Sequence, residues 1–133
     1  MRIVSPDGHS WVELDRLSSG NGYDAWAVEA STQTAHGDVF RGRNGDLHLL
    51  NIERFVAALD AFVLNRQTPV QVDGTYDSFI RFTGTTNGVL LEFRVGAADH
   101  LSKSHAVSGA FPLAQEALLQ VVAAFKEVAS IDT

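Results

Sequence analysis

The sequence predicts an α+β fold in which two amphipathic helices pack on one face of a mainly antiparallel sheet of six to eight strands. Two observations support this prediction. Much of the chain alternates apolar and polar residues, which is typical of strands with one buried face. Two segments instead repeat their apolar residues at helical spacing, one in the middle of the chain and one near its carboxyl end. The expected order is strands, helix, strands, helix, in a single domain over residues 1–133.

The first strands are expected before residue 50. RIV and SWVELDRL flank a turn at Asp7-Gly8, which predicts a hairpin with Val12 and Leu14 on its apolar face. SSGNGYD is a loop by composition. AWAVEASTQT alternates again, with Trp26 on the apolar face, and GDVFRGRNGDLHLL follows as one strand or a short pair of strands.

Two segments predict the helices. In NIERFVAALDAFVLN the apolar stripe comprises Ile52, Phe55, Val56, Leu59, Phe62 and Val63. Asn51 is placed to cap the first turn with its side chain, and Pro69 prevents continuation of the helix. In PLAQEALLQVVAAFKEVA the stripe comprises Ala114, Leu118, Val121, Val122, Phe125 and Val128, and Pro112 suits the first turn. FVAALDAF and LLQVVAAF look alike, which suggests either an internal duplication or a chance likeness of amphipathic helices.

Between the helices, VQVDGTYDSF and IRFTGTTNGVLLEFRV predict further strands, and HLSKSHAVSG adds one more. Asn87-Gly88 is typical of a two-residue hairpin turn, and that register places Arg81 opposite Arg94. Like charges directly opposite each other are unfavourable. Two interpretations follow: a solvated ion lattice with neighbouring carboxylates, which we favour, or a patch that contacts an anionic partner.

Composition narrows the class of protein. The net charge is −6 and is spread along the chain without a basic cluster, so a nucleic-acid partner is not expected. There is no cysteine, which excludes disulfides and thiolate chemistry. The start MRIVSPDGHSW lacks the apolar core of a signal peptide, and no apolar run approaches a membrane span. We therefore expect a cytoplasmic protein that does not bind membranes.

No motif for catalysis or cofactor binding is found. The glycine-containing segments SSGNG and RGRNGD lack the spacing of nucleotide-binding loops, and no nucleophile elbow is present. Asp99, His100 and His105 carry groups that can bind a metal, but their spacing on a loop or strand specifies no third ligand. We expect no catalytic residues, no metal and no cofactor.

The candidate partner-binding residues are aromatic side chains beside carboxylates, because tyrosine and tryptophan are frequent interface anchors. They are Tyr23, Asp24, Trp26, Asp73, Tyr76 and Asp77. The alternative is ordinary turn chemistry with the aromatic rings folded inward. Two further functions stay open. One is a small-ligand-binding or enzymatic domain with a pocket between sheet and helices, and the other is self-association through the small residues Ala57, Ala58 and Ala61.

Three segments carry a resemblance to a known family: FRGRNGDLHLLNIERFVAALDAF, GVLLEFRVGAAD and FPLAQEALLQVVAAF. In hydrophobic pattern and segment order, residues 24–126 resemble the WapI-type immunity proteins and related bacterial domains. The resemblance implies a cytoplasmic bacterial protein that binds and neutralises a cognate toxin domain. Such toxins are often nucleases with basic clefts, which an acidic partner would complement. The family supplies no functional residues that can be carried over position by position.

Overall fold

The computed structural model describes residues 1–20, 23–98 and 104–130, without the side chains of residues 18–20, 23–24 and 129–130. These residues form eight strands and two helices, namely β1 (Arg2–Val4), β2 (Trp11–Gly20), β3 (Tyr23–Gln33), β4 (Val39–Leu50), α1 (Ile52–Phe62), β5 (Val70–Gly74), β6 (Phe79–Thr85), β7 (Gly88–Ala98), β8 (Ser104–Leu113) and α2 (Gln115–Ser130).

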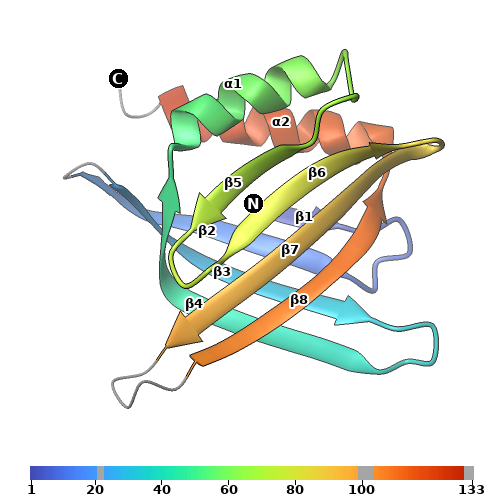
Figure 1. Cartoon of the computed structure of the whole chain (residues 1–133), viewed down its shortest axis with the longest axis horizontal. Helices are drawn as coiled ribbons and strands as arrows, with labels where there is room; N and C mark the ends of the chain where they lie inside the picture. Colours follow the sequence, from blue (N-terminus) through green and yellow to red (C-terminus); the bar gives the residue numbers. More distant parts are fainter. Residues whose placement is uncertain (21–22, 99–103, 131–133) are drawn as a thin grey trace.

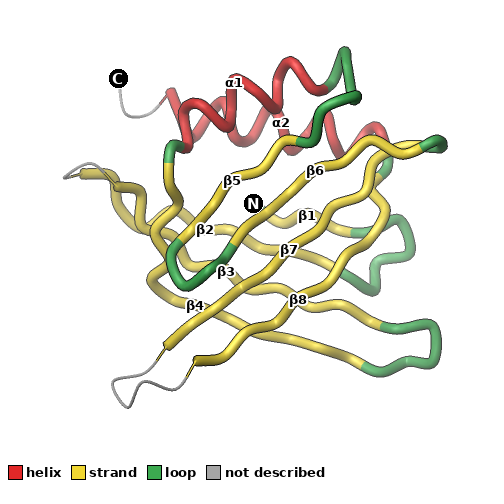
Figure 2. The backbone as a smooth tube through the Cα atoms, viewed as in Figure 1, coloured by secondary structure: helices red, strands yellow, loops and turns green. Residues whose placement is uncertain are grey.

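The eight strands belong to one antiparallel sheet, in which every strand pairs with its neighbours in the sequence. The two helices lie together on one side of the strands (Figure 1, Figure 2). The predicted α+β class, strand number and element order are therefore confirmed. None of the helices in the described part of the chain combines the length and apolarity that crossing a membrane requires.

The sheet folds back on itself between β4 and β5. These two strands are joined only where Leu49 pairs with Gly74 and Leu50 pairs with Asp73. The strands of the second half then cross over those of the first, and β7 and β8 contact β4 (Figure 1). Asn44 of β4, which is buried, donates a hydrogen bond of 2.8 Å from its Nδ2 to the carbonyl of Gly96 in β7. The result is two groups of strands that share one core.

Aromatic side chains from both halves meet in this core beneath the helices. Phe125 of α2 contacts Phe55 of α1 edge-to-face with ring centroids 5.2 Å apart, and Trp26 of β3 at 6.3 Å. Phe82 of β6 lies 6.3 Å from Phe55. Such ring pairs contribute stability beyond the apolar area they bury. Both helices are therefore fixed by contacts that span the two groups of strands.

The strands show the predicted faces, because Val12, Leu14 and Trp26 are all buried. The prediction of a loop at SSGNGYD was wrong in extent. β2 continues to Gly20 and β3 begins at Tyr23, so most of this segment is strand. Composition misled here because polar residues are common on strands that extend beyond the core.

The junction before α1 differs from the prediction. The helix buries Ile52, Phe55, Val56, Leu59 and Phe62, as its apolar stripe predicts. Asn51, however, makes no side-chain capping hydrogen bond, and its backbone is left-handed with φ 55° and ψ 45°. Asparagine tolerates this conformation better than most residues. Asn51 therefore serves as a sharp corner between β4 and α1.

The start of α2 also differs. Pro112 lies in β8, where it pairs with Leu90, and the helix begins at Gln115. The carbonyl of Ala114 accepts a hydrogen bond of 3.0 Å from the Leu118 amide. The apolar stripe at Leu118 and Phe125 is buried, as predicted.

The β6–β7 hairpin has a different register from the one that Asn87-Gly88 predicts. Thr85 pairs with Gly88, so the two turn residues are Thr86 and Asn87, and neither has a positive φ. Arg81 therefore lies opposite Glu92, whereas Arg94 lies opposite Phe79. The buried face is unchanged, because this register differs from the predicted one by an even number of residues.

Each half of the chain contains four strands followed by one helix. β1–β4 precede α1, and β5–β8 precede α2. This repeated order is what an internal duplication would produce, and the duplication itself stays a hypothesis.

Candidate functional site

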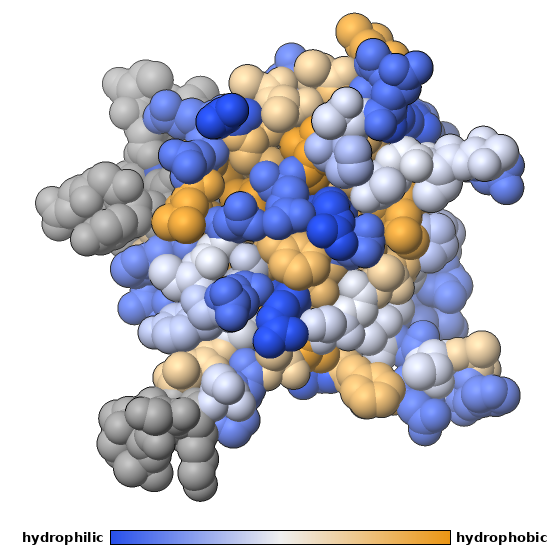
Figure 3. Space-filling view, viewed as in Figure 1, coloured by the Kyte–Doolittle hydropathy of each residue, from blue (hydrophilic) through white to orange (hydrophobic). Residues whose placement is uncertain are grey.

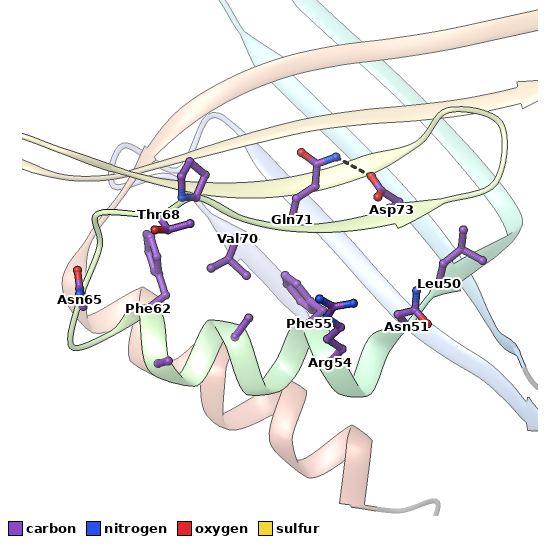
Figure 4. A pocket seen from close by; sticks show the side chains of 13 residues that line it. Leu50, Asn51, Arg54, Phe55, Phe62, Asn65, Thr68, Val70, Gln71 and Asp73 are labelled. Carbon is purple, nitrogen blue, oxygen red and sulfur yellow. Dashed lines mark hydrogen bonds between the residues drawn. The ribbon is translucent and has the colours of Figure 1, made fainter.

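A groove of about 550 Å³ runs between α1 and β5 (Figure 4). Its lining comes from the end of β4, from α1, from the loop after the helix and from β5, and comprises Leu50, Asn51, Arg54, Phe55, Ala58, Ala61, Phe62, Asn65, Thr68, Pro69, Val70, Gln71 and Asp73. The apolar rings of Phe55 and Phe62 belong to the core, so the groove opens from the core toward solvent.

The α1 wall is lined by small side chains. Ala58 and Ala61 are exposed and carry only a Cβ atom, which leaves room beside the helix. Arg54 and Asn51 lie at one end of the groove and Asn65 lies at the other (Figure 4). Ala57, Ala58 and Ala61 were predicted to permit close approach of another helix. In the structure, Ala58 and Ala61 leave room in the groove.

The β5 wall is a strand edge. β5 pairs with β6 over four residue pairs, from Val70 with Phe82 to Asp73 with Phe79. On its other side it pairs with β4 only at Asp73 and Gly74. The segment from Val70 to Val72 therefore has a strand neighbour on the β6 side alone, and its other edge faces the groove.

Polar side chains cover the outer surface of β5, β6 and β7. Gln71 Nε2 donates to Asp73 Oδ1 at 2.5 Å, and Arg81 Nη1 donates to Gln71 Oε1 at 3.1 Å. Arg81 also forms a two-pronged contact with Glu92, with N–O distances of 3.2 and 2.9 Å. Thr83 Oγ1 donates to Glu92 Oε1 at 3.3 Å. Figure 3 shows hydrophilic groups across the middle of this face, with hydrophobic groups among them.

This network bears on the two interpretations of the arginines, which lie opposite Glu92 and Phe79 and not opposite each other. The hydrogen bonds from Arg81 lower the pKa of the Glu92 carboxyl, and the contact with Glu92 raises the pKa of Arg81. Arg81 is therefore engaged in an ion lattice, as we favoured. Arg94 makes a long contact of 3.5 Å from its Nη1 to Ser108 Oγ.

The structure brings three of the six predicted site residues together. Asp73 lines the groove, and Tyr76 and Asp77 occupy the turn that follows β5. Tyr76 is 51% exposed. These three residues form one rim, which we call the β5–β6 rim.

The other three predicted residues lie in β3. Trp26 is only 1% exposed and packs on Phe125, so it is part of the core and offers no surface to a partner. The side chains of Tyr23 and Asp24 are outside the described part of the structure. The backbone of Asp24 pairs with Leu49, and Leu49 pairs with Gly74, so β3 begins at the same end of the sheet as the β5–β6 rim.

The turn that carries the rim is held in an unusual conformation. Tyr76 and Asp77 have left-handed backbones with φ 60° and φ 58°. Non-glycine residues rarely adopt this region, and it costs on the order of 1–2 kcal/mol per residue. Several hydrogen bonds hold the turn. They include Gly74 N–H to the Ser78 carbonyl at 2.8 Å, Ser78 N–H to the Thr75 carbonyl at 3.2 Å, Thr75 N–H to the His48 carbonyl at 3.0 Å, and Gly96 N–H to Ser78 Oγ at 2.9 Å. Strain that is held in place in this way is characteristic of functional surfaces.

The groove residues Pro69 and Gln71 were not predicted as site residues, and Ala58 and Ala61 were predicted only as a surface for self-association. Two signals were present in the sequence. Small residues on the exposed side of a helix leave space for another chain, and a proline immediately before a strand is typical of an edge. Neither signal indicates that α1 lies beside β5.

The groove holds no constellation for acid–base or metal chemistry. Its only charged lining residues are Arg54 and Asp73. Across the described ranges, no three or more histidine, aspartate or glutamate side chains gather as metal ligands would. His105 is exposed in β8, whereas Asp99 and His100 lie outside the described residues.

Comparisons of the chain with protein-family models, with curated proteins and with solved structures find no match.

Proposed function

We propose that this chain is an immunity-type protein that binds a cognate toxin domain and neutralises it by surface contact. The contact surface that we propose is the groove between α1 and β5 together with the β5–β6 rim. The main support is that a concave surface with an apolar floor includes the Asp73 carboxylate, and that the turn following β5 adds an exposed tyrosine and a second carboxylate. An apolar centre with a polar margin is the usual composition of a protein interface.

The chemistry of the rim agrees with a basic partner. Tyr76 supplies a large aromatic side chain, which is a frequent anchor of binding energy. Asp73 and Asp77 add negative charge at the same edge, and the whole chain carries a net charge of −6. Complementary charge increases the rate of association with a basic cleft and disfavours other partners.

Binding of a small ligand is the second candidate, because the volume of the groove lies in the usual range for ligand pockets. Such pockets usually present several convergent polar groups. Here the lining contains neither a histidine nor a second carboxylate, and the core between sheet and helices is filled by aromatic rings. These features support binding over catalysis, and a macromolecule over a metabolite.

The test is to co-express the chain with the product of the gene immediately upstream, where that product is toxic, and to measure survival and complex formation. Asp73→Lys combined with Tyr76→Asn should weaken the complex by at least about tenfold, since interface anchors often contribute 2 kcal/mol or more. Asparagine tolerates the left-handed backbone of residue 76, so the turn is retained.

The matched control is Asp38→Lys, which makes the same charge change at the opposite end of β4. This variant should bind within about twofold of the unchanged chain, because surface charges far from a contact have small effects. Survival no better than with an empty vector would reject the toxin proposal. Equal weakening by the rim variant and by the control would reject the proposed surface.

A further inference from the structure

We propose that the groove binds one extended segment of a partner protein, which adds to the sheet as a strand on the free edge of β5. The identity of that partner rests on the proposed function, whereas the mode of binding rests on the geometry of β5 and α1. The segment is expected to carry an apolar side chain directed at Ala58 and Ala61.

The free edge exists because β4 turns into α1 too early to cover β5. Leu50 is the last residue of β4 that pairs with β5, opposite Asp73. The next residue, Asn51, has a left-handed backbone and directs the chain into the helix. If β4 continued as a strand, Ile52 would lie opposite Gln71, two residues before Asp73 in β5. Ile52 is instead the first residue of α1. The ladder therefore stops with β5 half paired.

The direction of the backbone groups of β5 follows from two hydrogen bonds at its end. Gly74 N–H points to β6, where it donates to the Ser78 carbonyl, and Thr75 N–H points to β4, where it donates to the His48 carbonyl. Backbone groups alternate in direction along a strand. The N–H and C=O of Gln71 therefore point away from β6 and toward the groove.

No described residue of α1 or of its flanking loops forms a backbone hydrogen bond with Gln71. Pro69, the residue before β5, lines the groove and has no N–H to offer. One donor and one acceptor, both from Gln71, therefore face the groove. This is the pattern that an antiparallel strand satisfies, since residues in a hydrogen-bonded pair exchange both bonds.

The helix side of the groove fits an extended segment as well. α1 contains 11 residues, so it is about 16 Å long at 1.5 Å per residue. About five residues of a strand cover that length at 3.3 Å per residue. Ala58 and Ala61 leave space for a side chain of the added strand, while Phe55 and Phe62 supply an apolar floor. Main-chain pairing combined with a side-chain pocket is a known mode of peptide recognition.

The probe is a displayed library of random ten-residue peptides, selected on the immobilised full chain. The net charge of −6 predicts that enriched peptides have a net positive charge. Gln71→Pro removes the N–H that faces the groove and the glutamine side chain. It leaves the backbone pairing with β6 in place. Gln71→Ala is the matched control, since it removes the same side chain and keeps the N–H.

We expect Gln71→Pro to weaken the selected peptides by about tenfold or more, because a buried acceptor on the peptide loses its donor. Gln71→Ala should change affinity by less than about threefold, and the Gln71 amide should exchange more slowly when a peptide is bound. Ala58→Trp fills the groove from the α1 side, leaves the sequence of β5 unchanged and should also abolish binding. This second variant keeps the test decisive if Gln71→Pro does not fold.

Three outcomes would overturn the inference: failure to select any peptide, selected peptides that bind both Gln71 variants equally, and a concentration-dependent dimer that Gln71→Pro abolishes. The last would mean that a second copy occupies the edge. Failure of the toxin test alongside peptide binding that depends on Gln71 would remove the proposed function and leave this binding mode standing. Toxin protection that is unaffected by Gln71→Pro and Ala58→Trp would reject this binding mode and leave the proposed function standing.

Discussion

Gly96 lies where three segments of the chain meet. Its N–H donates to Ser78 Oγ at 2.9 Å and its carbonyl accepts from Asn44 Nδ2 at 2.8 Å. A Cβ atom built on Gly96 would overlap the carbonyl oxygen of Tyr76. This residue therefore lets the β5–β6 turn pack directly on β7, which fixes the rim in position.

Gly96→Ala should lower the free energy of unfolding by about 1–3 kcal/mol, because the added methyl group forces the Tyr76 backbone to move. Urea unfolding measures this change. Gly45→Ala is the matched control: it lies in β4, is exposed and would meet only the flexible end of Arg43. The control should differ by less than about 0.5 kcal/mol. Equal stabilities of the two variants would show that the turn does not depend on this contact.

Asn51 and Asn87 show how far the identity of a single residue predicts its backbone conformation. Asn51 and Asn87 were both assigned the most frequent role for their context, a helix cap and a hairpin turn with positive φ. In the structure it is Asn51 that has the left-handed backbone, whereas Asn87 does not. Asparagine suits caps and left-handed corners alike, so the choice between them depends on neighbouring segments.

Among the elements, the β6–β7 hairpin carries the best-defined ion pair on the outer face. Arg81 and Glu92 lie directly opposite each other, and both side chains are about one third exposed. Opposite charges at facing positions favour this register over the one that would place two arginines together. The charges of Arg81 and Glu92 thus help to set the register between β6 and β7.

Glu92→Gln should remove a small stabilisation that depends on pH. The folded-state pKa of Glu92 is lowered by its hydrogen bonds with Arg81. The unfolded value is about 4.3, so the stabilisation is complete above that pH and is lost as pH falls through the lower folded-state pKa. For a partly exposed pair we expect about 0.2–1 kcal/mol at pH 7.

Unfolding of the unchanged chain and of Glu92→Gln, compared between pH 7 and pH 3, measures this effect. The difference should shrink as the pH falls. Thr85→Val, on the same strand but outside the network, should show no such dependence. A difference that is constant across the range would contradict the ion-pair explanation.

Helices and strand faces could be predicted from the sequence because periodicity reports burial directly. Phe55, Leu59, Leu118 and Phe125 all lie where their spacing places them. Register could not be predicted as well, since a shift by two residues keeps every side chain on its face. The groove could not be predicted at all, because it arises from a contact between α1 and β5 rather than from either element.

On the scale of the whole molecule, the two groups of strands depend on each other. β4 and β5 are joined by only two residue pairs, yet Phe125 of the second half packs on Trp26 and Phe55 of the first. Asp60 of α1 and Lys126 of α2 also form an ion pair of 2.7 Å. Core contacts therefore hold the halves together more than the strand ladder does.

The chain should consequently unfold in a single transition. Trp26 lies in the first half and packs on Phe125 of the second, so tryptophan fluorescence reports the packing between the halves, whereas far-UV circular dichroism reports the helices and strands of both. The two urea transitions should coincide, as expected for a small cooperative domain. Midpoints that differ between the two signals would show that the halves fold independently.

The six candidate partner-binding residues do not share one surface of the molecule, because Trp26 lies in the core whereas Asp73, Tyr76 and Asp77 are exposed. Asp73, Tyr76 and Asp77 were predicted as an aromatic residue between acids. Asp73 is exposed in β5, and Tyr76 and Asp77 are exposed in the turn that follows it. Trp26 was chosen by the same rule but lies beneath the helices. Local composition does not show which side of a strand the helices will cover.

The single left-handed corner at Asn51 has a consequence for how this molecule can diversify. One or two residues inserted at that corner would let β4 run further and close the opening beside β5, while leaving both walls intact. Shortening β4 by the same amount would expose more of the strand edge. The length of the open strand edge is thus set by the position at which β4 turns into α1.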